Sequence, residues 1–509
     1  MITDMNTLTD RYRKQIRGVL SCYDRMVITG TLPGVCYAAG MALFLRVRQL
    51  RLFDYPKLME PLRERIRKNA ERLAQAHGIE IEFIRKRNFR KEDRIAERVK
   101  ERGGHPGLVH IFSAMESCPS FYPWHDKGSG TTSLRAKDGK CLHYYFYFLH
   151  EEFGLCYLRV PTWAPFRLQF YCNGHNWLAS QLRQAGIAFR QLDNAVVECA
   201  DWERAQALAD AFPVPRLHQV LDELAEQFCP VLDHFGVTYH WSLMQVEYAT
   251  DLVFGRPSDL RPLYESLVRT AIHSVKAEHV TTFLGRKLHP NYQGELGNDF
   301  HTRIQGTRLK HHMGPVSLKL YDKMGLVLRI ETTANDVSFF KHHRQVEHRD
   351  GRKETKLATM QKTIYSLSPL RELLLAANRR YLAFLSDLTD PSPGVRQVNK
   401  LATPVRENDR SYRGFNVFDP KDLDLFIALS HGGHTIHGFK NSTLRCRLHN
   451  HTSAQISRRL QCLRKHGLIK KIARTYKYYL TRFGQAVVLT SLKLRELVVI
   501  PALAGLQPA

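Results

Sequence analysis

Two stretches near the middle of the chain, HWSLMQVEYATDLVF (residues 240–254) and VSLKLYDKMGLVLRIETT (residues 316–333), alternate apolar and polar side chains. A period of two residues is typical of strands that bury one face. The first stretch predicts a strand with Met244, Val246, Tyr248, Leu252 and Phe254 on one face and Gln245, Glu247 and Asp251 on the other. The second predicts a hairpin turning at Asp322–Gly325, with Val316, Leu318, Leu320, Leu328 and Ile330 on its apolar face and Lys319, Tyr321, Arg329 and Glu331 on its polar face.

Charged side chains gather on the polar face if these strands share one sheet. Glu247, Asp251 and Glu331 would then lie near Lys319 and Arg329. Carboxylates are the ligands that Mg²⁺ and Mn²⁺ prefer, and the two basic side chains suit a phosphodiester. The pattern therefore predicts a divalent-metal site, with Glu247, Asp251, Glu331 and Lys319 as catalytic candidates. The alternative is a sheet whose outer face carries cross-strand salt bridges, such as Lys319–Glu331, and no ligand.

The composition indicates a globular protein with a polyanionic partner. The chain has 509 residues, a formal net charge of +26, and 43% hydrophobic and 24% charged residues. A chain of that length is too long for a single hydrophobic core, so several domains are expected. The positive charge favours nucleic acid as the partner. No apolar run approaches about 18 residues, which disfavours a membrane partner. The N-terminal residues lack the apolar core of a signal peptide, so we expect a cytoplasmic protein.

We expect a multidomain protein of the α/β (α+β) class. The predicted segments are a helical N-terminal region (1–104), an α/β domain with aromatic strands (105–215), an α+β sheet domain with the charged face (216–386), a linker (387–420) and a winged helix-turn-helix (421–509). The cysteines are scattered without a Cys-x-x-Cys pair, so neither disulfides nor zinc are expected. No strand-GxxxxGK-helix context occurs, which argues against a nucleotide cofactor.

Aromatic residues are concentrated in His143–Phe148 and in RVPTWAPFRLQFY (residues 159–171). Such rings, with Arg159 and Arg167 beside them, could stack on unpaired bases. The alternative is that adjacent aromatic residues form sheet core on both faces, and both interpretations stay open. The histidine doublets His311–His312 and His342–His343 lie in basic stretches and predict solvated phosphate contacts.

The stretch HTSAQISRRLQCLRKHGLIKKIARTYKYYLTRFG (residues 451–484) has the pattern of a winged helix. From Lys440 to Arg482 the chain has twelve Lys and Arg and no Asp or Glu, which favours phosphate binding over a protein-protein module. Ile456, Leu460 and Leu463 recur at helical spacing. The expected nucleic-acid contacts are Gln455, Arg458, Arg459 and Lys465 on the recognition helix and Lys470, Lys471, Arg474, Lys477 and Tyr478 on the wing.

These C-terminal residues resemble MarR-like winged-helix DNA-binding domains. Such domains occur in regulators, transposases and replication proteins, so the resemblance implies binding and not a reaction.

A second resemblance lies in the middle of the chain. The order QVEYATD (245–251), TTFLGRK (281–287), SLKLYDK (317–323) and LRIETT (328–333) resembles the strand motifs of rolling-circle replication initiators, of the plasmid trans-acting and filamentous-phage types. The resemblance implies that Glu247, Asp251 and Glu331 bind metal, that Lys319, Lys323 and Arg329 contact DNA, and that a tyrosine attacks the strand.

The chain departs from that family at two points. It has no His-apolar-His triplet, which disfavours a nuclease of the paired-histidine type, and no tyrosine identifies itself as the nucleophile. Tyr365 and Tyr381 are positional candidates. Tyr381 is preferred because Arg379 and Arg380 could lower its pKa, and the alternative for it is a place in a helix core.

The prediction is a DNA-binding protein of a mobile element, replication-initiator-like or transposase-like. If it is an enzyme, we expect strand nicking or strand transfer that depends on Mg²⁺ or Mn²⁺. The alternatives are a non-enzymatic winged-helix transcriptional regulator and a protein that binds structured RNA. DNA is the expected partner, RNA the alternative, and a homodimer is left open.

Overall fold

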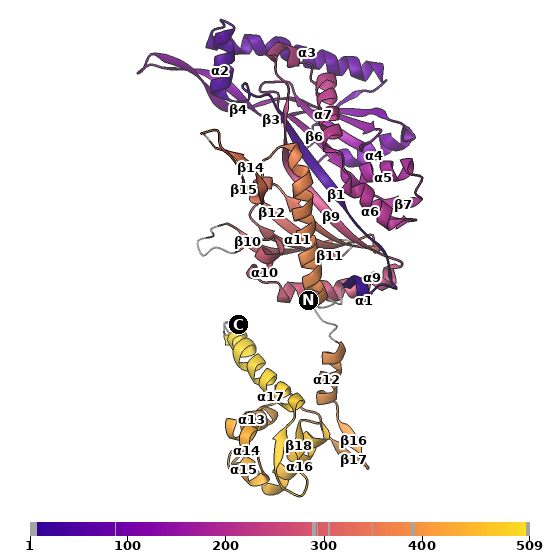
Figure 1. The fold of residues 1–509 in the computed structure, drawn as a ribbon, viewed down its shortest axis with the longest axis vertical. Coiled ribbons are helices and arrows are strands. Elements are labelled where there is room, and N and C mark those ends of the chain that lie inside the picture. Colours follow the sequence, from indigo (N-terminus) through magenta and orange to yellow (C-terminus); the bar gives the residue numbers. More distant parts are fainter. Residues whose placement is uncertain are drawn as a thin grey trace. The chain divides into compact units, whose positions relative to one another are not determined.

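The computed structural model describes residues 8–86, 88–287, 292, 294–303, 306–348, 350–387 and 392–504. Its contacts divide the chain into two compact units, residues 1–388 and 389–509. Both helices and sheets are present, so the mixed α/β class is as predicted (Figure 1). No helix in the described ranges has the length and apolar character needed to cross a bilayer.

The first unit is built on one 11-stranded sheet, with the order β10-β11-β12-β13-β9-β1-β6-β5-β4-β3-β2. Its strands are β1 (Ile16–Thr31), β2 (Ile81–Phe83), β3 (Gly107–Asp126), β4 (Thr131–His150), β5 (Gly154–Pro161), β6 (Leu168–Asn173), β9 (His240–Phe254), β10 (Leu296–Arg303), β11 (Gly306–Met313), β12 (Val316–Lys323) and β13 (Val327–Ala334). Two hairpins stand apart from this sheet, β7 (Phe189–Leu192) with β8 (Ala195–Cys199) and β14 (Lys341–Glu347) with β15 (Lys353–Thr359).

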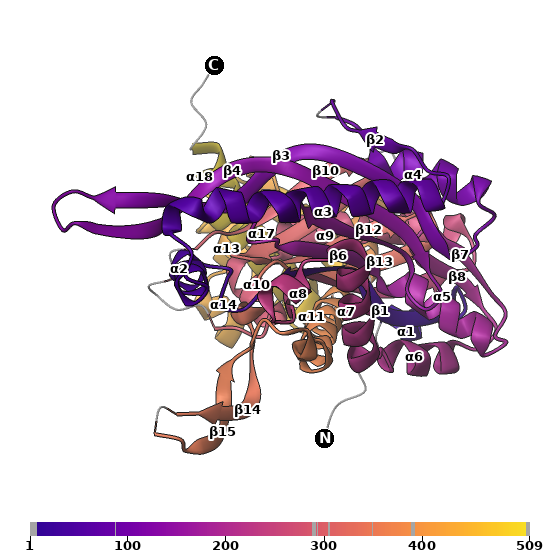
Figure 2. The same cartoon turned by 90° about the horizontal axis from the view of Figure 1, so that it is seen from above.

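Helices pack against this sheet throughout the first unit. They are α1 (Leu8–Arg11), α2 (Ala38–Val47), α3 (Tyr55–Ala76), α4 (Lys91–Glu101), α5 (Gly174–Gln184), α6 (Trp202–Asp210), α7 (Val214–Phe228), α8 (Leu232–Phe235), α9 (Pro257–Ser274), α10 (Ala277–Phe283) and α11 (Leu367–Asp387). Seen from above, α3 lies along β3 and β4, and the β3–β4 hairpin extends beyond it (Figure 2). Residues 125–140 belong mostly to this extended hairpin, whose strands pair as far as Asp126 and Thr131.

The predicted hairpin of residues 316–333 is confirmed, with Lys319 opposite Glu331.

The boundaries predicted at residues 104 and 215 do not separate sheets. β1, in the segment expected to be helical, pairs with β9 on one side and β6 on the other, so strands of all three predicted segments share one sheet. Strand β1 lacks a clear period of two because it is buried on both faces along much of its length.

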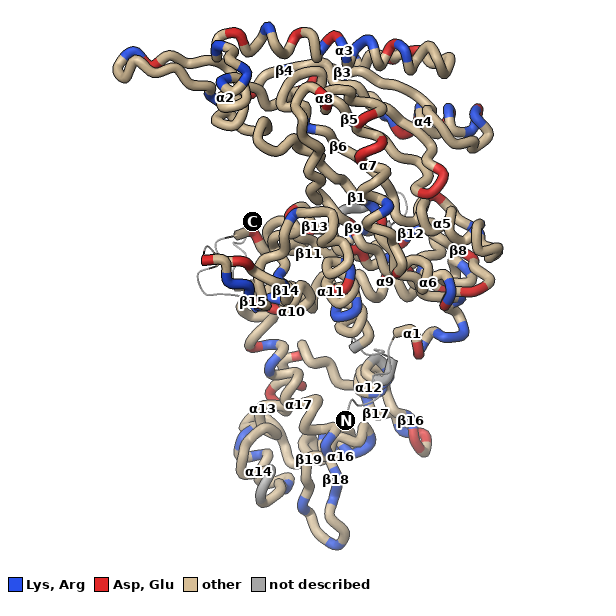
Figure 3. The backbone as a smooth tube through the Cα atoms, turned by 45° about the horizontal axis from the view of Figure 1, so that its top comes forward, with Lys and Arg blue, Asp and Glu red and all other residues tan. Residues whose placement is uncertain are grey.

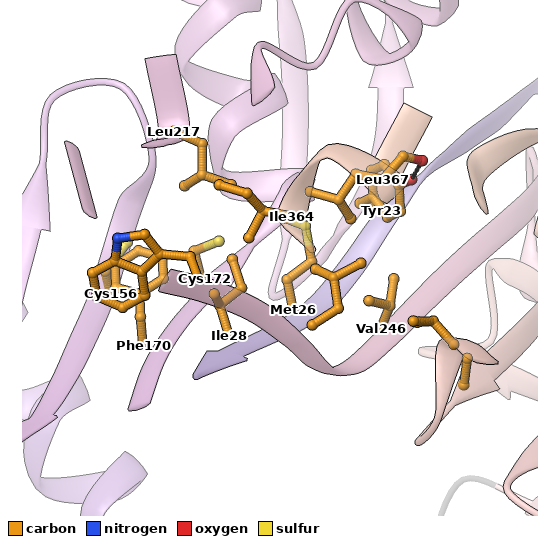
Figure 4. Packing of buried hydrophobic residues seen from close by; sticks show 14 of the residues in the cluster. Tyr23, Met26, Ile28, Cys156, Phe170, Cys172, Leu217, Val246, Ile364 and Leu367 are labelled. Atoms are coloured by element: carbon orange, nitrogen blue, oxygen red, sulfur yellow. Dashed lines mark hydrogen bonds between the residues drawn. The ribbon is translucent and has the colours of Figure 1, made fainter. Parts of the chain in front are cut away.

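Helix α11 is fixed against one face of β9 and β13 by a buried amide. The Asn378 side chain donates to the Tyr248 carbonyl at 3.0 Å and to Thr250 Oγ1 at 3.1 Å, and accepts from Thr332 Oγ1 at 2.6 Å. Figure 4 shows the apolar packing on the same side of the sheet, where Met26, Ile28 and Phe170 meet Leu217 of α7 and the 3₁₀ turn at Ile364. The opposite face of β9 and β13 therefore carries Glu247, Asp251, Arg329 and Glu331.

The second unit begins with α12 (Ser392–Ala402) and the short hairpin β16 (Val405–Glu407) and β17 (Arg410–Tyr412). The predicted linker is thus largely folded, because Leu401 and Phe415 are buried in the core of this unit; residues 388–391 of that linker lie outside the described residues. The elements that follow are α13 (Pro420–Leu429), α14 (Gly432–His437), α15 (Asn441–Arg445), α16 (Ser453–Lys465), β18 (Ile469–Lys471), β19 (Tyr478–Leu480), α17 (Arg482–Leu494) and α18 (Ile500–Ala504).

Local chemistry explains where α16 begins and which face it buries. Thr452 caps the helix by accepting from the Gln455 backbone N–H, and the Gln455 side chain accepts from the Thr452 N–H at 2.8 Å. Ile456, Leu460 and Leu463 are buried at helical spacing, as predicted.

We predict that Asn378→Ala lowers the free energy of unfolding by about 1–3 kcal/mol, because it leaves buried polar groups of β9 and β13 without partners. Arg379→Ala, at the exposed next position of α11, should change that free energy by less than about 0.5 kcal/mol. Urea denaturation of both variants measures the difference. Equal losses in the two variants would show that the amide does not hold the helix to the sheet.

Candidate functional site

A β-bulge in the middle of β1 positions the first residue of the candidate site. The β1–β9 register passes from Tyr23↔Tyr248 to Met26↔Val246, so Asp24 and Arg25 both stand opposite Glu247. Strand β6 begins its pairing with β1 at Arg25↔Asn173, where the two halves of the sheet meet. The bulge lets Asp24 join the polar face, while Tyr23 and Met26 stay in the apolar core.

Three carboxylates from adjacent strands converge at this point. One oxygen each from Asp24 of β1, Glu247 of β9 and Glu331 of β13 lie within 4.8 Å of one another. Asp24 and Glu331 are buried, and Glu247 is partly exposed. We call these three residues the acidic cluster.

Lys319 of β12 bridges two members of the acidic cluster. Its Nζ donates to Glu331 Oε1 at 2.6 Å and to Glu247 Oε1 at 3.1 Å. Burial alone would lower the pKa of Lys319, but the two carboxylates raise it above the ordinary value. Burial and the nearby Glu331 raise the pKa of Glu247, against the opposing effect of Lys319. Tyr321 adds a hydrogen bond, with its hydroxyl donating to Glu331 Oε2 at 2.6 Å.

A fully buried arginine lies beside the cluster. Arg329 donates through Nε and Nη2 to the two oxygens of Asp251, both at 2.6 Å, and through Nη1 to Asp24 Oδ2 at 3.0 Å. Its Nη2 also donates to the Asn194 carbonyl in the β7–β8 turn at 2.6 Å. Burial disfavours the charged form, but the carboxylates of Asp251 and Asp24 hold the pKa of Arg329 well above its ordinary value.

Asp24 is surrounded by polar groups from four segments, three of which donate hydrogen bonds to it. Besides Arg329, the Asn173 amide donates to Oδ1 at 2.6 Å, and the Asn194 amide donates to Oδ1 at 2.6 Å and Oδ2 at 2.7 Å. His175, at the start of α5, has Nδ1 3.6 Å from Asp24 Oδ1. Burial would raise the pKa of Asp24, but Arg329 and His175 hold it well below the usual range. Asp24 is therefore a carboxylate at neutral pH.

The structure corrects two of the predicted site residues. Asp251 was predicted to bind metal, but Arg329 occupies both of its oxygens, and Asp24 lies in the cluster instead. Arg329 was predicted to contact DNA, yet its side chain is fully buried. The signal for Asp24 in the sequence is a charged pair, Asp24–Arg25, that interrupts an apolar run.

Tyr381 is not a candidate nucleophile in this structure. It is fully buried on α11, where its hydroxyl lies 2.7 Å from His311 Nε2, and burial raises its pKa rather than lowering it. His311 is paired with Leu318, so it faces the side of the sheet opposite to Lys319 and the acidic cluster. The helix-core alternative for Tyr381 is confirmed. His311, predicted to be a solvated phosphate contact, is buried as well.

Tyr365, the other positional candidate, is exposed near α7 and hydrogen-bonds to His218 Nδ1 at 2.8 Å.

The aromatic run His143–Phe148 is core on both faces of β4. Tyr144, Phe146 and Phe148 belong to the main core, and Tyr145 and Tyr147 pack with Phe112 beneath Ile95 of α4.

Lys and Arg are concentrated in one part of the second unit, along α16, β18 and the turn that follows (Figure 3). Five of the predicted contacts are exposed and have no carboxylate partner in the described part of the chain: Arg458, Lys470, Lys471, Arg474 and Lys477. Tyr476, which is not among the predicted contacts, is 79% exposed at the same turn, and Lys471 Nζ lies 5.4 Å from its ring centroid.

The other four predicted contacts in this unit have internal partners. Lys465 forms an ion pair with Glu407 of β16, and Arg459 Nη1 donates to the Lys421 carbonyl at 2.8 Å. Tyr478 packs on the core and stacks against Phe439, and Gln455 caps its own helix. Lys465 is neutralised by a segment predicted to be a linker, so the local sequence could not show its partner.

The chain was compared with protein-family models, with curated proteins and with solved structures, and none of the three comparisons found a match.

We predict that Arg329→Ala lowers the free energy of unfolding by about 3–5 kcal/mol, because it leaves the buried carboxylates of Asp24 and Asp251 without their cation. Arg25→Ala, one position from Asp24 and exposed, is the matched control and should change that free energy by less than about 1 kcal/mol. Thermal and urea unfolding measure both. A small effect of Arg329→Ala would mean that the buried network contributes little to the fold.

Proposed function

We propose that the protein binds DNA and cleaves or transfers one of its strands with a divalent cation held by the acidic cluster. The observation that carries this proposal is the convergence of Asp24, Glu247 and Glu331 from three adjacent strands. Rigid strands hold such ligands more accurately than loops do.

The donor set fits Mg²⁺ or Mn²⁺. An ion with ligand distances of about 2.1 Å holds its ligand atoms roughly 3–4 Å apart, so oxygens within 4.8 Å need only small shifts. The four carboxylates of the cluster and of Asp251 outnumber the two permanent cations, Lys319 and Arg329, which leaves a negative site for a cation. Carboxylate oxygens without cysteine ligands disfavour zinc.

A bound cation would polarise a phosphoryl oxygen and acidify a water molecule. The protein's own residues then have separate tasks. Arg329 fixes the Asp24 carboxylate, and Tyr321 and Lys319 fix that of Glu331. Lys319 also supplies a partly exposed positive charge for a phosphate oxygen. We assign the nucleophile to water, because Tyr381 lies on the opposite side of the sheet.

The second unit supports the binding part of the proposal. Helices α13, α15 and α16 precede the hairpin β18–β19, and a bridge between Phe439 and Tyr478 adds a third extended segment. This order is compatible with the proposed winged helix-turn-helix, in which α16 would be the recognition helix and the β18–β19 hairpin the wing. A binding module and a metal site in one chain fit a replication-initiator-like or transposase-like protein of a mobile element.

One observation favours a different function. Lys319 already neutralises Glu247 and Glu331, so the acidic cluster could be a structural ion network in a non-enzymatic regulator. A comparison of binding and cleavage separates the two functions. Tight duplex binding without cleavage under any metal condition supports the regulator, and structured RNA that outcompetes duplex DNA at equal salt supports an RNA-binding protein.

We predict that the protein nicks supercoiled or single-stranded DNA with Mn²⁺ and not with EDTA. Glu247→Gln and Glu331→Gln should each reduce the nicking rate by more than about ten-fold. Loss of a residue that only supports a metal ligand typically costs about ten-fold or more, so loss of a ligand should cost at least as much. Glu152→Gln is the matched control, since Glu152 is partly buried and paired with Arg216 at 2.7 Å outside the cluster. Metal-dependent nicking that survives in both cluster variants would contradict the assignment.

We predict that changing Lys470, Lys471, Arg474 and Lys477 together to Ala weakens duplex binding and flattens its salt dependence. Four lost phosphate contacts correspond to a decrease of up to about 3.6 in the slope of log K against log salt. Lys465→Ala should leave the slope unchanged, because Glu407 already neutralises that side chain. Fluorescence anisotropy across a salt series tests both, and an unchanged slope in the fourfold variant would exclude the wing as the DNA-binding surface.

A further inference from the structure

From Arg25 onward in β1, and along β6 and β5, one face of the sheet is sealed and the other is partly open. On the sealed face, Met26, Ile28, Cys156, Leu158, Phe170 and Cys172 are all fully buried, and Figure 4 shows several of them in the apolar core. The alternate positions are more open: Arg25 is exposed, and Thr29, Tyr157, Arg159, Gln169 and Tyr171 are partly exposed, although Val27 and Asn173 on the same face are buried. We call this second set the open strip.

Two tyrosine rings form the centre of the open strip. Tyr157 and Tyr171 are opposite each other on β5 and β6, and their rings stack with centroids 5.1 Å apart and planes within 9°. The Arg25 guanidinium lies over the Tyr171 ring, 5.7 Å from its centroid. Partly exposed aromatic rings on an open sheet face are a surface on which unpaired bases stack.

The charge beside these rings suits a phosphate backbone. Arg25 has no carboxylate partner among the described residues, so its charge is available to a ligand. Lys91 at the start of α4 also lacks a described ion pair, and its Nζ lies 3.2 Å from the Tyr145 ring centroid. Arg159 is not available in the same way, because Glu116 holds it at 2.7 Å. Arg25 is therefore the cation that lies beside the ring pair itself, and Lys91 lies over a ring of the neighbouring strand β4.

The open strip ends at the acidic cluster. Arg25 and Asp24 are the two residues of the bulge opposite Glu247, and Asn173, which is paired with Arg25, donates to Asp24. A DNA strand lying over Tyr157 and Tyr171 would next pass Arg25. The neighbouring residues of the sheet are Asp24 and Glu247 of the acidic cluster.

We propose that the open strip binds unpaired bases of single-stranded DNA and leads that strand to the acidic cluster. The inference rests on the proposed function and narrows its substrate to a locally unpaired strand. Bases in a duplex are stacked on one another, so their faces cannot lie on a protein ring. Tyr157 covers one side of the Tyr171 ring, and an unpaired base would enter on the other side, between that ring and Arg25. Stacking also accepts any base, because every base has a π-face. The winged helix proposed for the second unit would bind the adjoining duplex, which favours DNA over RNA.

The test measures anisotropy of a fluorescent oligothymidylate of about 15 nucleotides, in EDTA and in Ca²⁺. The full chain carries the fourfold wing change (Lys470, Lys471, Arg474 and Lys477 to Ala), so that binding by the second unit is weakened. Tyr157→Ala with Tyr171→Ala should weaken binding by about ten-fold or more, whereas Tyr157→Phe with Tyr171→Phe should keep it, because the rings remain. Arg25→Ala should weaken binding and reduce the salt slope by about 0.7.

Three controls make the outcome specific. Tyr365→Ala removes an exposed ring elsewhere in the first unit and should bind as the parent does. The double Ala variant should keep the parent's thermal unfolding midpoint within a few degrees and its residual affinity for blunt duplex DNA. The parent should bind the single strand in EDTA, where no divalent cation is free, so a failure of metal chemistry is distinguishable from a failure of the strip.

Unchanged affinity in the folded double Ala variant overturns the proposal, and so does equal weakening in the double Phe variant. Tighter binding of oligouridylate than of oligothymidylate, if lost with the two tyrosines, overturns the assignment to DNA.

Discussion

The fold of the first unit depends on the ion pairs that the fully buried guanidinium of Arg329 forms with Asp24 and Asp251. The guanidinium connects β13 to Asp251 of β9, to Asp24 of β1 and to the backbone of the β7–β8 turn. An uncompensated charge at this depth would be very unfavourable, so each carboxylate requires the arginine and the arginine requires both carboxylates. The network thereby fixes the position of Asp24, and through it the geometry of the acidic cluster.

The two faces of the long sheet have separate physical roles. One face holds the apolar core, to which α11 is fixed through Asn378. The other face carries the charged network, the acidic cluster and the ring pair of Tyr157 and Tyr171. The bulge at Asp24–Arg25 joins these features, because it turns one carboxylate toward the cluster and leaves the next side chain exposed.

The sign of the charge differs between the chain as a whole, which is positive, and the acidic cluster, which is negative. A net charge of +26 attracts polyanions from a distance, whereas the acidic cluster repels them locally. A divalent cation at the cluster would remove that conflict. Without one, Lys319 partly does so by pairing with Glu247 and Glu331, which is why the same residues are compatible with a structural role.

The sequence by itself determined the features that depend on local periodicity. The period of two in residues 316–333 predicted the hairpin and the Lys319–Glu331 pair, and helical spacing predicted the buried face of α16. Tertiary structure decided which charges meet. Asp24 and Arg329 are 305 residues apart along the chain, and Lys465 pairs with Glu407, which lies in a segment expected to be a linker. No local pattern encodes such pairs, because strand order and the burial of a charge follow from contacts between distant segments.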